Sequence, residues 1–249
     1  MVELISLSAG YRKKAVLTDV DLRFESGYVT SVIGVNGSGK STLIKTAAGI
    51  LPALCGEVRL DGADIAALSH TERARRVAYL PQTRNLSDMT VMSLVLHGRF
   101  PYLGFPRRYT DSDRAVALRM LEVVGIPDLA SRPLAELSGG QRQKAYLAMA
   151  LCQETENLLL DEPTSFLDVS CRIDLWNLCR RLAGEGKCVV CVSHDIAEAL
   201  KYSDRVALFD GGNLKAYATP SELVCSGALD AAFGVRITHL GGMEIKIEK

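Results

Sequence analysis

The sequence predicts an α/β fold with a mainly parallel sheet and an inserted helical segment. Residues 29–35, 157–162 and 188–193 are short apolar runs without alternation, as expected for strands covered on both faces. A helical period lies between the last two runs, and Gly184 and Gly186 end it; its apolar positions are Leu175, Leu178, Cys179 and Leu182. Residues 86–157 carry helical patterns and no convincing strand.

Further elements follow from the same patterns. Residues 5–7, 16–24, 57–62 and 77–81 indicate strands, and a helix is expected from about Ser41. Residues 232–249 alternate around a Gly-Gly pair, which is typical of a hairpin. Because no repeat, low-complexity tract or linker divides the chain, we expect one domain over 1–249. Its core would comprise about 1–85 and 158–249, and its helical subdomain about 86–157.

Composition narrows the class of protein. The 249 residues include 29 Lys+Arg and 29 Asp+Glu, so the formal net charge is zero. This balance argues against nucleic acid as the main partner. We expect a cytosolic chain, because it has no signal-like start and no apolar run near the ~18–20 residues that cross a bilayer. Seven cysteines without a paired framework suit reduced thiols, and the side chains of Cys188 and Cys191 should point to opposite faces of a strand.

One glycine-rich loop predicts a nucleotide site. Residues 34–41 read GVNGSGKS, which fits G-x-x-x-x-G-K-[ST] after a buried strand and before a helix. Glycines let backbone N–H groups converge on phosphate oxygens, and Lys40 adds a cation. The Ser41 hydroxyl can ligate Mg²⁺. The alternative is a glycine-rich turn that matches by chance, which the two correct flanks disfavour.

The strand at 157–162 supplies acidic partners. Asp161 ends the apolar run, where its carboxylate can hold the shell of Mg²⁺, and Glu162 can take a proton from the attacking water. An ordinary cap or ion pair explains these two acids equally well when they are considered alone. Pro163 should stop the strand and favour an exposed turn.

A second phosphate-binding loop points to a family. Residues 137–141 read LSGGQ and begin another helix. Together with GVNGSGKST, AYLPQ, LLLDEPTSFLD and VSHD, in that order over almost the whole chain, this motif resembles the ATP-binding subunits of ABC transporters. The resemblance implies a P-loop NTPase core with a mainly parallel sheet, an N-terminal antiparallel β subdomain and an inserted α-helical subdomain. A plain helix N-cap at Ser138 is the simpler alternative, although it does not explain why the glycines are paired.

The resemblance also implies roles for individual residues. ATP and Mg²⁺ would be the cofactors, and two copies would close head to tail so that the second loop completes the partner's site. Catalysis would fall to Glu162, His194, Lys40 and Gln82, and metal binding to Ser41, Gln82 and Asp161. Asp168 would lie at the dimer interface. The trans loop would be Ser138, Gly139, Gly140 and Gln141, and the nucleotide-binding residues Tyr11, Gly34, Asn36, Gly37, Ser38, Gly39, Lys40, Ser41 and Thr42.

Residues 97–143 resemble one subfamily, which serves importers of ferric siderophores, haem and cobalamin. The residues that carry this resemblance are Gly98, Arg99, Pro101, Tyr102, Asp111, Asp113 and the segment 129–132. A generic helical insertion from any importer is the alternative. The resemblance implies a separate membrane permease, a substrate-binding protein reached through it, and a peripheral place on the cytoplasmic face of the inner membrane.

Two other classes of protein share some of these motifs. A non-transport ATPase switch acting in DNA repair or on ribosomes would usually carry a long coiled-coil insertion or a second cassette, and neither is present. A small P-loop kinase would have no use for LSGGQ. We therefore rank the transporter subunit first.

Overall fold

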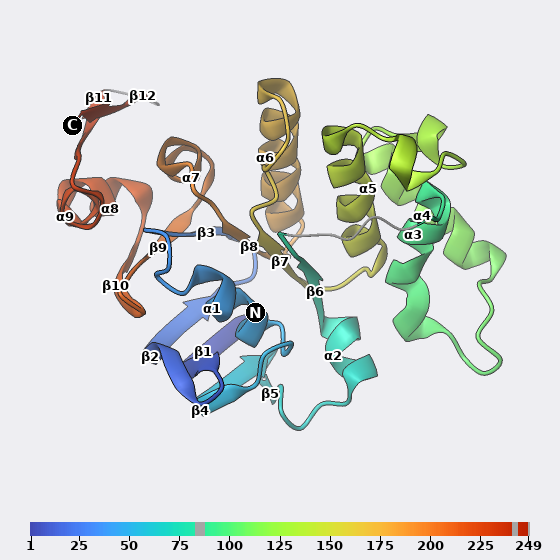
Figure 1. The fold of residues 1–249 in the computed structure, drawn as a ribbon, viewed down its shortest axis with the longest axis horizontal. Coiled ribbons are helices and arrows are strands. Elements are labelled where there is room, and N and C mark those ends of the chain that lie inside the picture. Colours follow the sequence, from blue (N-terminus) through green and yellow to red (C-terminus); the bar gives the residue numbers. More distant parts are fainter. Residues whose placement is uncertain (83–87, 241–243, 249) are drawn as a thin grey trace.

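The computed structural model describes residues 1–82, 88–240 and 244–248 (Figure 1). Its central sheet has six strands in the order β10-β9-β3-β8-β7-β6. Every neighbouring pair in it is parallel except β10 with β9, so the predicted mainly parallel sheet is confirmed. The strands are β3 (Val29–Gly34), β6 (Val77–Leu80), β7 (Asn157–Asp161), β8 (Cys188–Val192), β9 (Arg205–Asp210) and β10 (Asn213–Ala218).

A second, antiparallel sheet packs on one side of the core, with the strand order β2-β1-β4-β5. Helix α1 (Lys40–Ala47) lies between the two sheets, because Leu43 and Ile44 share one apolar cluster with Leu17 of β2 and Val32 of β3 (Figure 1). This arrangement confirms the expected N-terminal β subdomain. Its strands are β1 (Val2–Tyr11), β2 (Lys14–Phe24), β4 (Ala53–Leu60) and β5 (Ala63–Asp64).

Helices form a separate lobe beyond β6 (Figure 1). Between the end of β6 and the start of β7, the described residues form helices and loops and one isolated bridge, Thr90 to Pro133. The lobe is built from α3 (Val91–Leu96), η1 (His97–Tyr102), α4 (Asp111–Val123), η2 (Pro127–Leu129), η3 (Leu134–Glu136) and α5 (Gly139–Cys152). Its apolar side chains join those of α6 and β7 in one cluster, so the lobe continues the core.

The remaining helices cover the central sheet and its edges: α2 (His70–Arg76), α6 (Val169–Gly184), α7 (Ile196–Tyr202), α8 (Pro220–Cys225) and α9 (Ala228–Phe233). The predicted C-terminal hairpin strands form β11 (Arg236–Leu240) and β12 (Glu244–Glu248), which pair antiparallel. The Gly-Gly pair expected at their turn lies outside the described residues.

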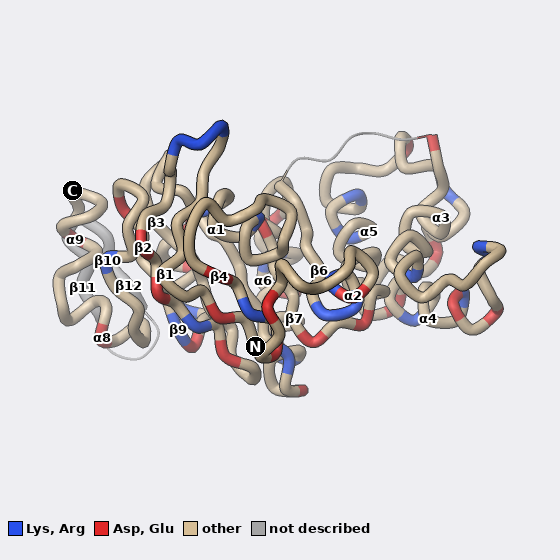
Figure 2. The backbone as a smooth tube through the Cα atoms, turned by 90° about the horizontal axis from the view of Figure 1, so that it is seen from below, with Lys and Arg blue, Asp and Glu red and all other residues tan. Residues whose placement is uncertain are grey.

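Charged residues of both signs are interspersed along the backbone in the view of Figure 2. This distribution agrees with the zero formal net charge of the sequence. None of the helices in the described part of the chain combines the length and the apolar character that a bilayer crossing requires.

The cysteine pair of β8 behaves as expected. The Cys188 side chain belongs to the apolar cluster that includes β1, β2 and α1, whereas Cys191 belongs to the cluster that includes α5 and α6. The Sγ of Cys191 lies 3.9 Å from that of Cys179 in α6, and both cysteines are free thiols. The prediction that the two side chains of the pair point to opposite faces is confirmed.

One local expectation was wrong in part. Pro163 itself is buried, and its carbonyl accepts a 2.5 Å hydrogen bond from Nε2 of Gln143 in α5, whereas Phe166 at the end of the same turn is 82% exposed. The proline stops β7 as predicted, but the helical lobe contacts the start of the turn. A buried carbonyl then needs a partner, and the Gln143 side chain supplies it.

Candidate active site

The loop after β3 has a backbone that only glycine permits. A Cβ on Gly34 would lie 2.1 Å from the Phe209 carbonyl oxygen, and one on Gly39 would lie 2.6 Å from Cδ2 of Leu17. Gly39 also precedes α1 in the left-handed region, with φ of 99°, and no side chain caps the helix there. The first N–H groups of α1 are therefore open to an anion, as a phosphate site requires.

Lys40 is held inside this loop. Its Nζ donates to the carbonyl oxygens of Gly34 at 2.8 Å and Val35 at 3.0 Å. Burial lowers the pKa of Lys40, while the nearby carboxylates of Glu162 and Asp161 act in the opposite direction. The ammonium group is thus fixed at the loop, where it faces the same acids that the sequence places at the end of β7.

Asp161 is a buried carboxyl group beside the loop. It is 1% exposed at the end of β7, and it accepts hydrogen bonds from Ser41 Oγ at 3.3 Å and Tyr79 Oη at 3.2 Å. Burial raises the pKa of this carboxyl, and the two hydrogen bonds partly oppose that rise. Tyr79 was not among the predicted site residues, because a tyrosine within a short strand carries no motif.

The side-chain oxygens of Ser41 and Asp161 fit a Mg²⁺ ion that is bound to a nucleotide. Ser41 and Asp161 supply one hydroxyl and one carboxylate, the hard ligands that Mg²⁺ prefers, and phosphates and water usually complete its shell. Among residues 1–82, 88–240 and 244–248, no group of three His, Cys, Asp or Glu side chains is arranged to hold a metal by itself.

Glu162 and His194 meet at the carboxyl ends of β7 and β8. Oε1 of Glu162 lies 2.5 Å from Nε2 of His194, and Ser165 Oγ donates to Oε2 at 3.4 Å. Glu162 has a left-handed backbone with φ of 52°, which turns the chain out of β7. The His194 side chain is 46% exposed, so this pair stands at the mouth of the site.

These residues surround one cavity of about 390 Å³. Its lining combines the predicted residues with one addition, Val16, which the sequence did not indicate because it lies in β2. The lining residues are Tyr11, Val16, Asn36, Gly37, Gly39, Lys40, Ser41, Thr42, Gln82, Glu162 and His194. Of the other predicted residues, Ser38 is buried, and its hydroxyl has no hydrogen-bond partner among the described residues. Asp161 does not line the cavity but accepts a hydrogen bond from Ser41, which does.

The second loop lies apart from this cavity. Ser138 caps α5: its Oγ accepts from the Gln141 N–H at 3.2 Å, and Oε1 of Gln141 accepts from the Ser138 N–H at 3.1 Å. The N-cap interpretation is thus correct. The loop is nonetheless largely exposed, and none of its four residues lines the cavity around Lys40. Asp168 similarly caps α6, since its Oδ1 accepts from the Cys171 N–H at 2.8 Å.

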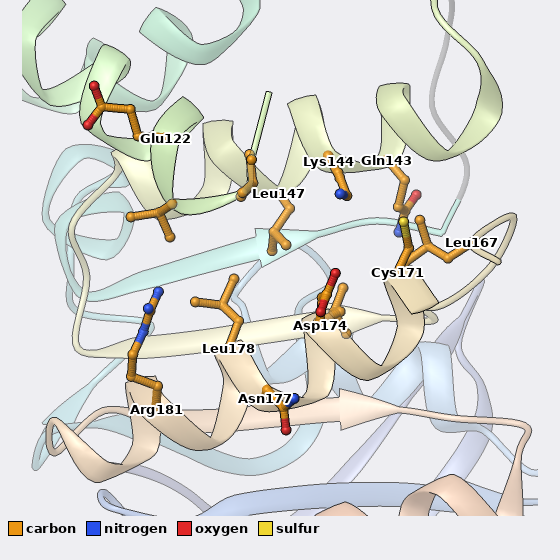
Figure 3. A pocket seen from close by; sticks show the side chains of 14 residues that line it. Glu122, Gln143, Lys144, Leu147, Leu167, Cys171, Asp174, Asn177, Leu178 and Arg181 are labelled. Atoms are coloured by element: carbon orange, nitrogen blue, oxygen red, sulfur yellow. The ribbon is translucent and has the colours of Figure 1, made fainter. Parts of the chain in front are cut away.

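Another cavity, of about 420 Å³, lies between α5, the end of α4 and α6 (Figure 3). Leu147 of α5 and Leu178 of α6 point toward each other across it, and Lys144 and Asp174 face each other from the same two helices (Figure 3). The interface between the helical lobe and α6 therefore contains an unfilled space.

Known proteins share this arrangement. Residues 17–165 match the family model described as ABC transporter. The achromobactin transport ATP-binding protein of Dickeya dadantii (strain 3937) is 37% identical over 231 residues, covering 92% of this chain and 86% of that protein. The ferric enterobactin transport ATP-binding protein of Escherichia coli (strain K12) is 37% identical over 232 residues, with the same coverage. A dimeric bacterial ABC transporter cassette of known structure has a TM-score of 0.79 at 27% identity, covering 88% of this chain and 99% of that chain.

The fold and the site define an ATP-binding cassette, and the chain belongs to the ABC transporter family. Within that family it is an ATPase, the kind of subunit that powers transport. The curated relatives at 34–37% identity include ATP-binding proteins of siderophore transport and iron(3+)-hydroxamate import. A further dimeric cassette, similar to this chain at 28% identity and a TM-score of 0.79, was solved in a post-hydrolysis state with ADP and phosphate.

Proposed function

We propose that the chain is the ATP-hydrolysing subunit of an importer of ferric siderophores, and that it works as a pair of copies docked on a separate membrane permease. One observation carries this proposal. The cavity around Lys40 holds the cation, the acids and the histidine of a hydrolytic site but lacks the exposed loop 138–141. A second copy is the natural source of that loop, because a closed two-fold pair supplies it to both sites at once.

ATP would bind with its phosphates on the loop between β3 and α1. The backbone N–H groups and Lys40 face the phosphate oxygens, and Tyr11 at the cavity edge offers a ring for the base. Ser41 and Asp161 would hold Mg²⁺, which neutralises charge on the phosphates when it is bound. Gln82 lines the same cavity and faces that region.

Hydrolysis would use Glu162 as the general base. A water oxygen attacks the γ-phosphorus, the bond from phosphorus to the ADP oxygen breaks, and the carboxylate of Glu162 accepts the proton of the water. His194 orients this carboxylate through its contact with Oε1, and Ser165 holds the other oxygen. The partner's loop 138–141 would complete the γ-phosphate cage through Ser138 and the exposed N–H groups of two glycines.

The cargo and partners rest on similarity. Relatives named for siderophore transport span most of this chain, and they match it over the helical lobe as well as the core. We infer that the lobe docks on the permease, that a substrate-binding protein delivers the cargo to that permease, and that the subunit works at the cytoplasmic face of the inner membrane. These similarities favour an importer over a DNA-repair or ribosome-associated switch.

The first experiment is the substitution Glu162→Gln. It removes the base and keeps the shape of the side chain, so ATP binding should persist while turnover falls by about a thousandfold. ATP should then convert the variant from monomer to dimer in sedimentation, because the closed pair reopens only after ATP hydrolysis and this variant does not hydrolyse ATP. Glu156→Gln, an exposed glutamate beside β7, is the matched control and should hydrolyse normally without trapping a dimer. Near-normal ATPase in Glu162→Gln would remove this residue from the role.

A second experiment addresses the cargo. Deletion of the gene should abolish uptake of radiolabelled ferric siderophore, and wild-type protein supplied from a plasmid should restore it. The Lys40→Ala variant supplied in the same way should not. Normal siderophore uptake in the deletion strain would contradict the proposed cargo while leaving the ATPase activity intact.

A further inference from the structure

Three consecutive cations stand at the turn between β1 and β2. Arg12, Lys13 and Lys14 are all exposed, and Figure 2 shows a continuous blue segment that projects from the tube there. In the part of the chain that the structure describes, none of these three side chains forms an ion pair. We name Arg12, Lys13 and Lys14 the basic turn.

The basic turn stands at the rim of the nucleotide cavity. Tyr11 at the end of β1 and Val16 in β2 both line that cavity, so both chain segments that lead to the turn reach it. The same hairpin contacts the phosphate-binding loop, because a Cβ on Gly39 would lie 2.6 Å from Cδ2 of Leu17 and 3.4 Å from Cγ1 of Val16. A nucleotide that enters the cavity therefore passes close to the three cations.

The backbone of the turn is unfavourable for the residues that occupy it. Tyr11 pairs with Lys14, so Arg12 and Lys13 are the two central residues of the hairpin turn. Their φ angles are 49° and 64°, both in the left-handed region, where a two-residue turn prefers Asn-Gly. Long side chains seldom adopt this conformation. The fold thus keeps two cations where a smaller pair would be more stable, which indicates a role beyond forming the turn.

The charges inside the cavity show what cations at its rim can add. Among the described residues that line it, Lys40 is cationic and Glu162 is anionic, and the Asp161 carboxyl lies next to Ser41. The lining alone therefore offers little net attraction to a distant anion. At about 0.01 M ionic strength the Debye length is about 30 Å, so charges at the rim act well outside the cavity. Charges placed around a cleft in this way speed the arrival of a ligand of opposite sign.

We propose that the basic turn steers the anionic nucleotide into the cavity, so that it governs the rate of ATP association. This inference rests on the proposed function, because it assumes that ATP binds around Lys40. Steering acts before contact, and it weakens as salt shortens the Debye length to about 3 Å at about 1 M. A direct contact with the bound nucleotide would behave differently, since its loss chiefly raises the rate of dissociation.

The test follows Mg²⁺-ATP that carries a fluorescent N-methylanthraniloyl group, in a stopped-flow instrument. The double variant Arg12→Asn/Lys13→Gly removes two cations and supplies the favoured turn, so its Tm should equal or exceed that of wild type. At about 0.01 M ionic strength its association rate constant should be about fivefold lower than that of wild type, and at about 0.5 M the two should agree within about twofold. Its dissociation rate constant should stay within about twofold of wild type.

Arg107→Asn/Arg108→Gly is the matched control. It removes two adjacent exposed cations from the loop between η1 and α4, and neither residue lines the cavity. The net charge of the chain changes by the same amount, so association in this control should match wild type at both salt concentrations. Lys40→Ala tests the site itself and should bind the same probe at least about tenfold more weakly.

Each outcome decides the matter. Association of Arg12→Asn/Lys13→Gly as fast as that of the control at low salt overturns steering and leaves the proposed function in place. A deficit that persists at high salt, or faster dissociation, overturns it too, because the turn then contacts the bound nucleotide. Lys40→Ala that binds the probe as tightly as wild type overturns the nucleotide site. If the Tm of the double variant falls, Arg12→Gln/Lys13→Gln replaces it, with the same loss of about fivefold expected.

Discussion

The carboxyl group of Asp161 is buried away from water by the fold itself, without a bound cation. Its exposed fraction is 1%, and its hydrogen bonds come from two neutral hydroxyl groups, those of Ser41 and Tyr79. Neutral donors compensate a buried negative charge less well than a cation does. Desolvation is the main cause of the raised pKa of Asp161, and the two hydrogen bonds oppose that rise only in part. Burial of the ionised Asp161 therefore carries an electrostatic cost, which Mg²⁺ bound with a nucleotide would relieve.

This cost predicts a pH dependence of stability. A carboxyl whose pKa is raised in the folded state holds its proton longer there than in the unfolded chain, so its ionisation destabilises the fold. The free energy of unfolding should decline as pH rises from the ordinary Asp value, about 4, through the raised pKa. Asp161→Asn should lack this decline and be more stable than wild type at pH 7, without nucleotide or metal.

Chemical denaturation between pH 4 and pH 8 measures this effect. Glu162→Gln is the comparison, since it leaves Asp161 in place: the decline should persist but be smaller, because the Glu162 carboxylate also raises the pKa of Asp161. The Asp161→Asn variant should also lose Mg²⁺-dependent ATPase activity, so stability and activity move in opposite directions. Equal stability of variant and wild type across this range would show that burial of the carboxylate carries no such cost.

At the scale of elements, Arg99 joins three parts of the helical lobe. Arg99 lies in η1, and its guanidinium donates to Oδ1 of Asp113 in the first turn of α4 at 3.1 Å. It also donates to the carbonyl oxygen of Cys152 at the end of α5 at 3.1 Å and to Oε2 of Glu154 at 2.7 Å. Its guanidinium also lies 4.2 Å from the ring centroid of Tyr102. The side chains of Arg99 and Asp113 are 11% and 10% exposed, so this junction is largely buried.

Removal of Arg99 should therefore weaken the lobe. Arg99→Met keeps the length of the side chain but leaves the buried Asp113 carboxylate without its cation, and we expect a loss of about 3 kcal/mol in the free energy of unfolding. Arg119→Met is the matched control, because Arg119 also binds Glu154 but its side chain is 57% exposed. That exposed pair should contribute under about 1 kcal/mol. Similar losses in urea denaturation of both variants would contradict the junction.

Helices and strands were predicted best from the sequence where a single pattern of apolar residues identifies the element. The buried runs at β3, β7 and β8 and the helical period of α6 were found, because continuous burial and a single apolar face leave direct traces in the sequence. Strands β9 and β10 were not predicted, since their short apolar runs carried no motif. The burial of Pro163 was not predicted, because the residue that covers its carbonyl, Gln143, lies in the helical lobe, and the local sequence gives no sign of such a contact.

The same distinction holds for the site. Residues with motif spacing, such as Lys40 and Glu162, lie together as predicted, whereas Tyr79 and Val16 reach the site through strand pairing alone. Arg99, Tyr102 and Asp113 were noted as marks of a subfamily, and the structure adds their physical connection. Sequence order cannot reveal which side chains meet at a junction of three helices.

At the scale of the whole molecule, the two loops lie on different parts of the surface, and a mixing experiment tests whether they serve different copies. Lys40→Ala should inactivate the loop that binds phosphate. Gly139→Asp should inactivate the signature loop, residues 138–141, because it sets a carboxylate against the γ-phosphate. This substitution should leave the fold intact, since among the described residues a Cβ there would meet Phe166 at an ordinary contact distance of 3.5 Å, and an acid suits a helix N-terminus.

Neither variant alone should hydrolyse ATP, but an equimolar mixture should recover activity. In each mixed pair, the intact Lys40 of one copy faces the intact signature loop of the other, while the second site carries both defects. Random assortment makes half of the pairs mixed, and each has one working site of two, so recovery should reach about a quarter of the wild-type rate. A mixture that stays as inactive as its components would mean that both loops must be intact in the same chain.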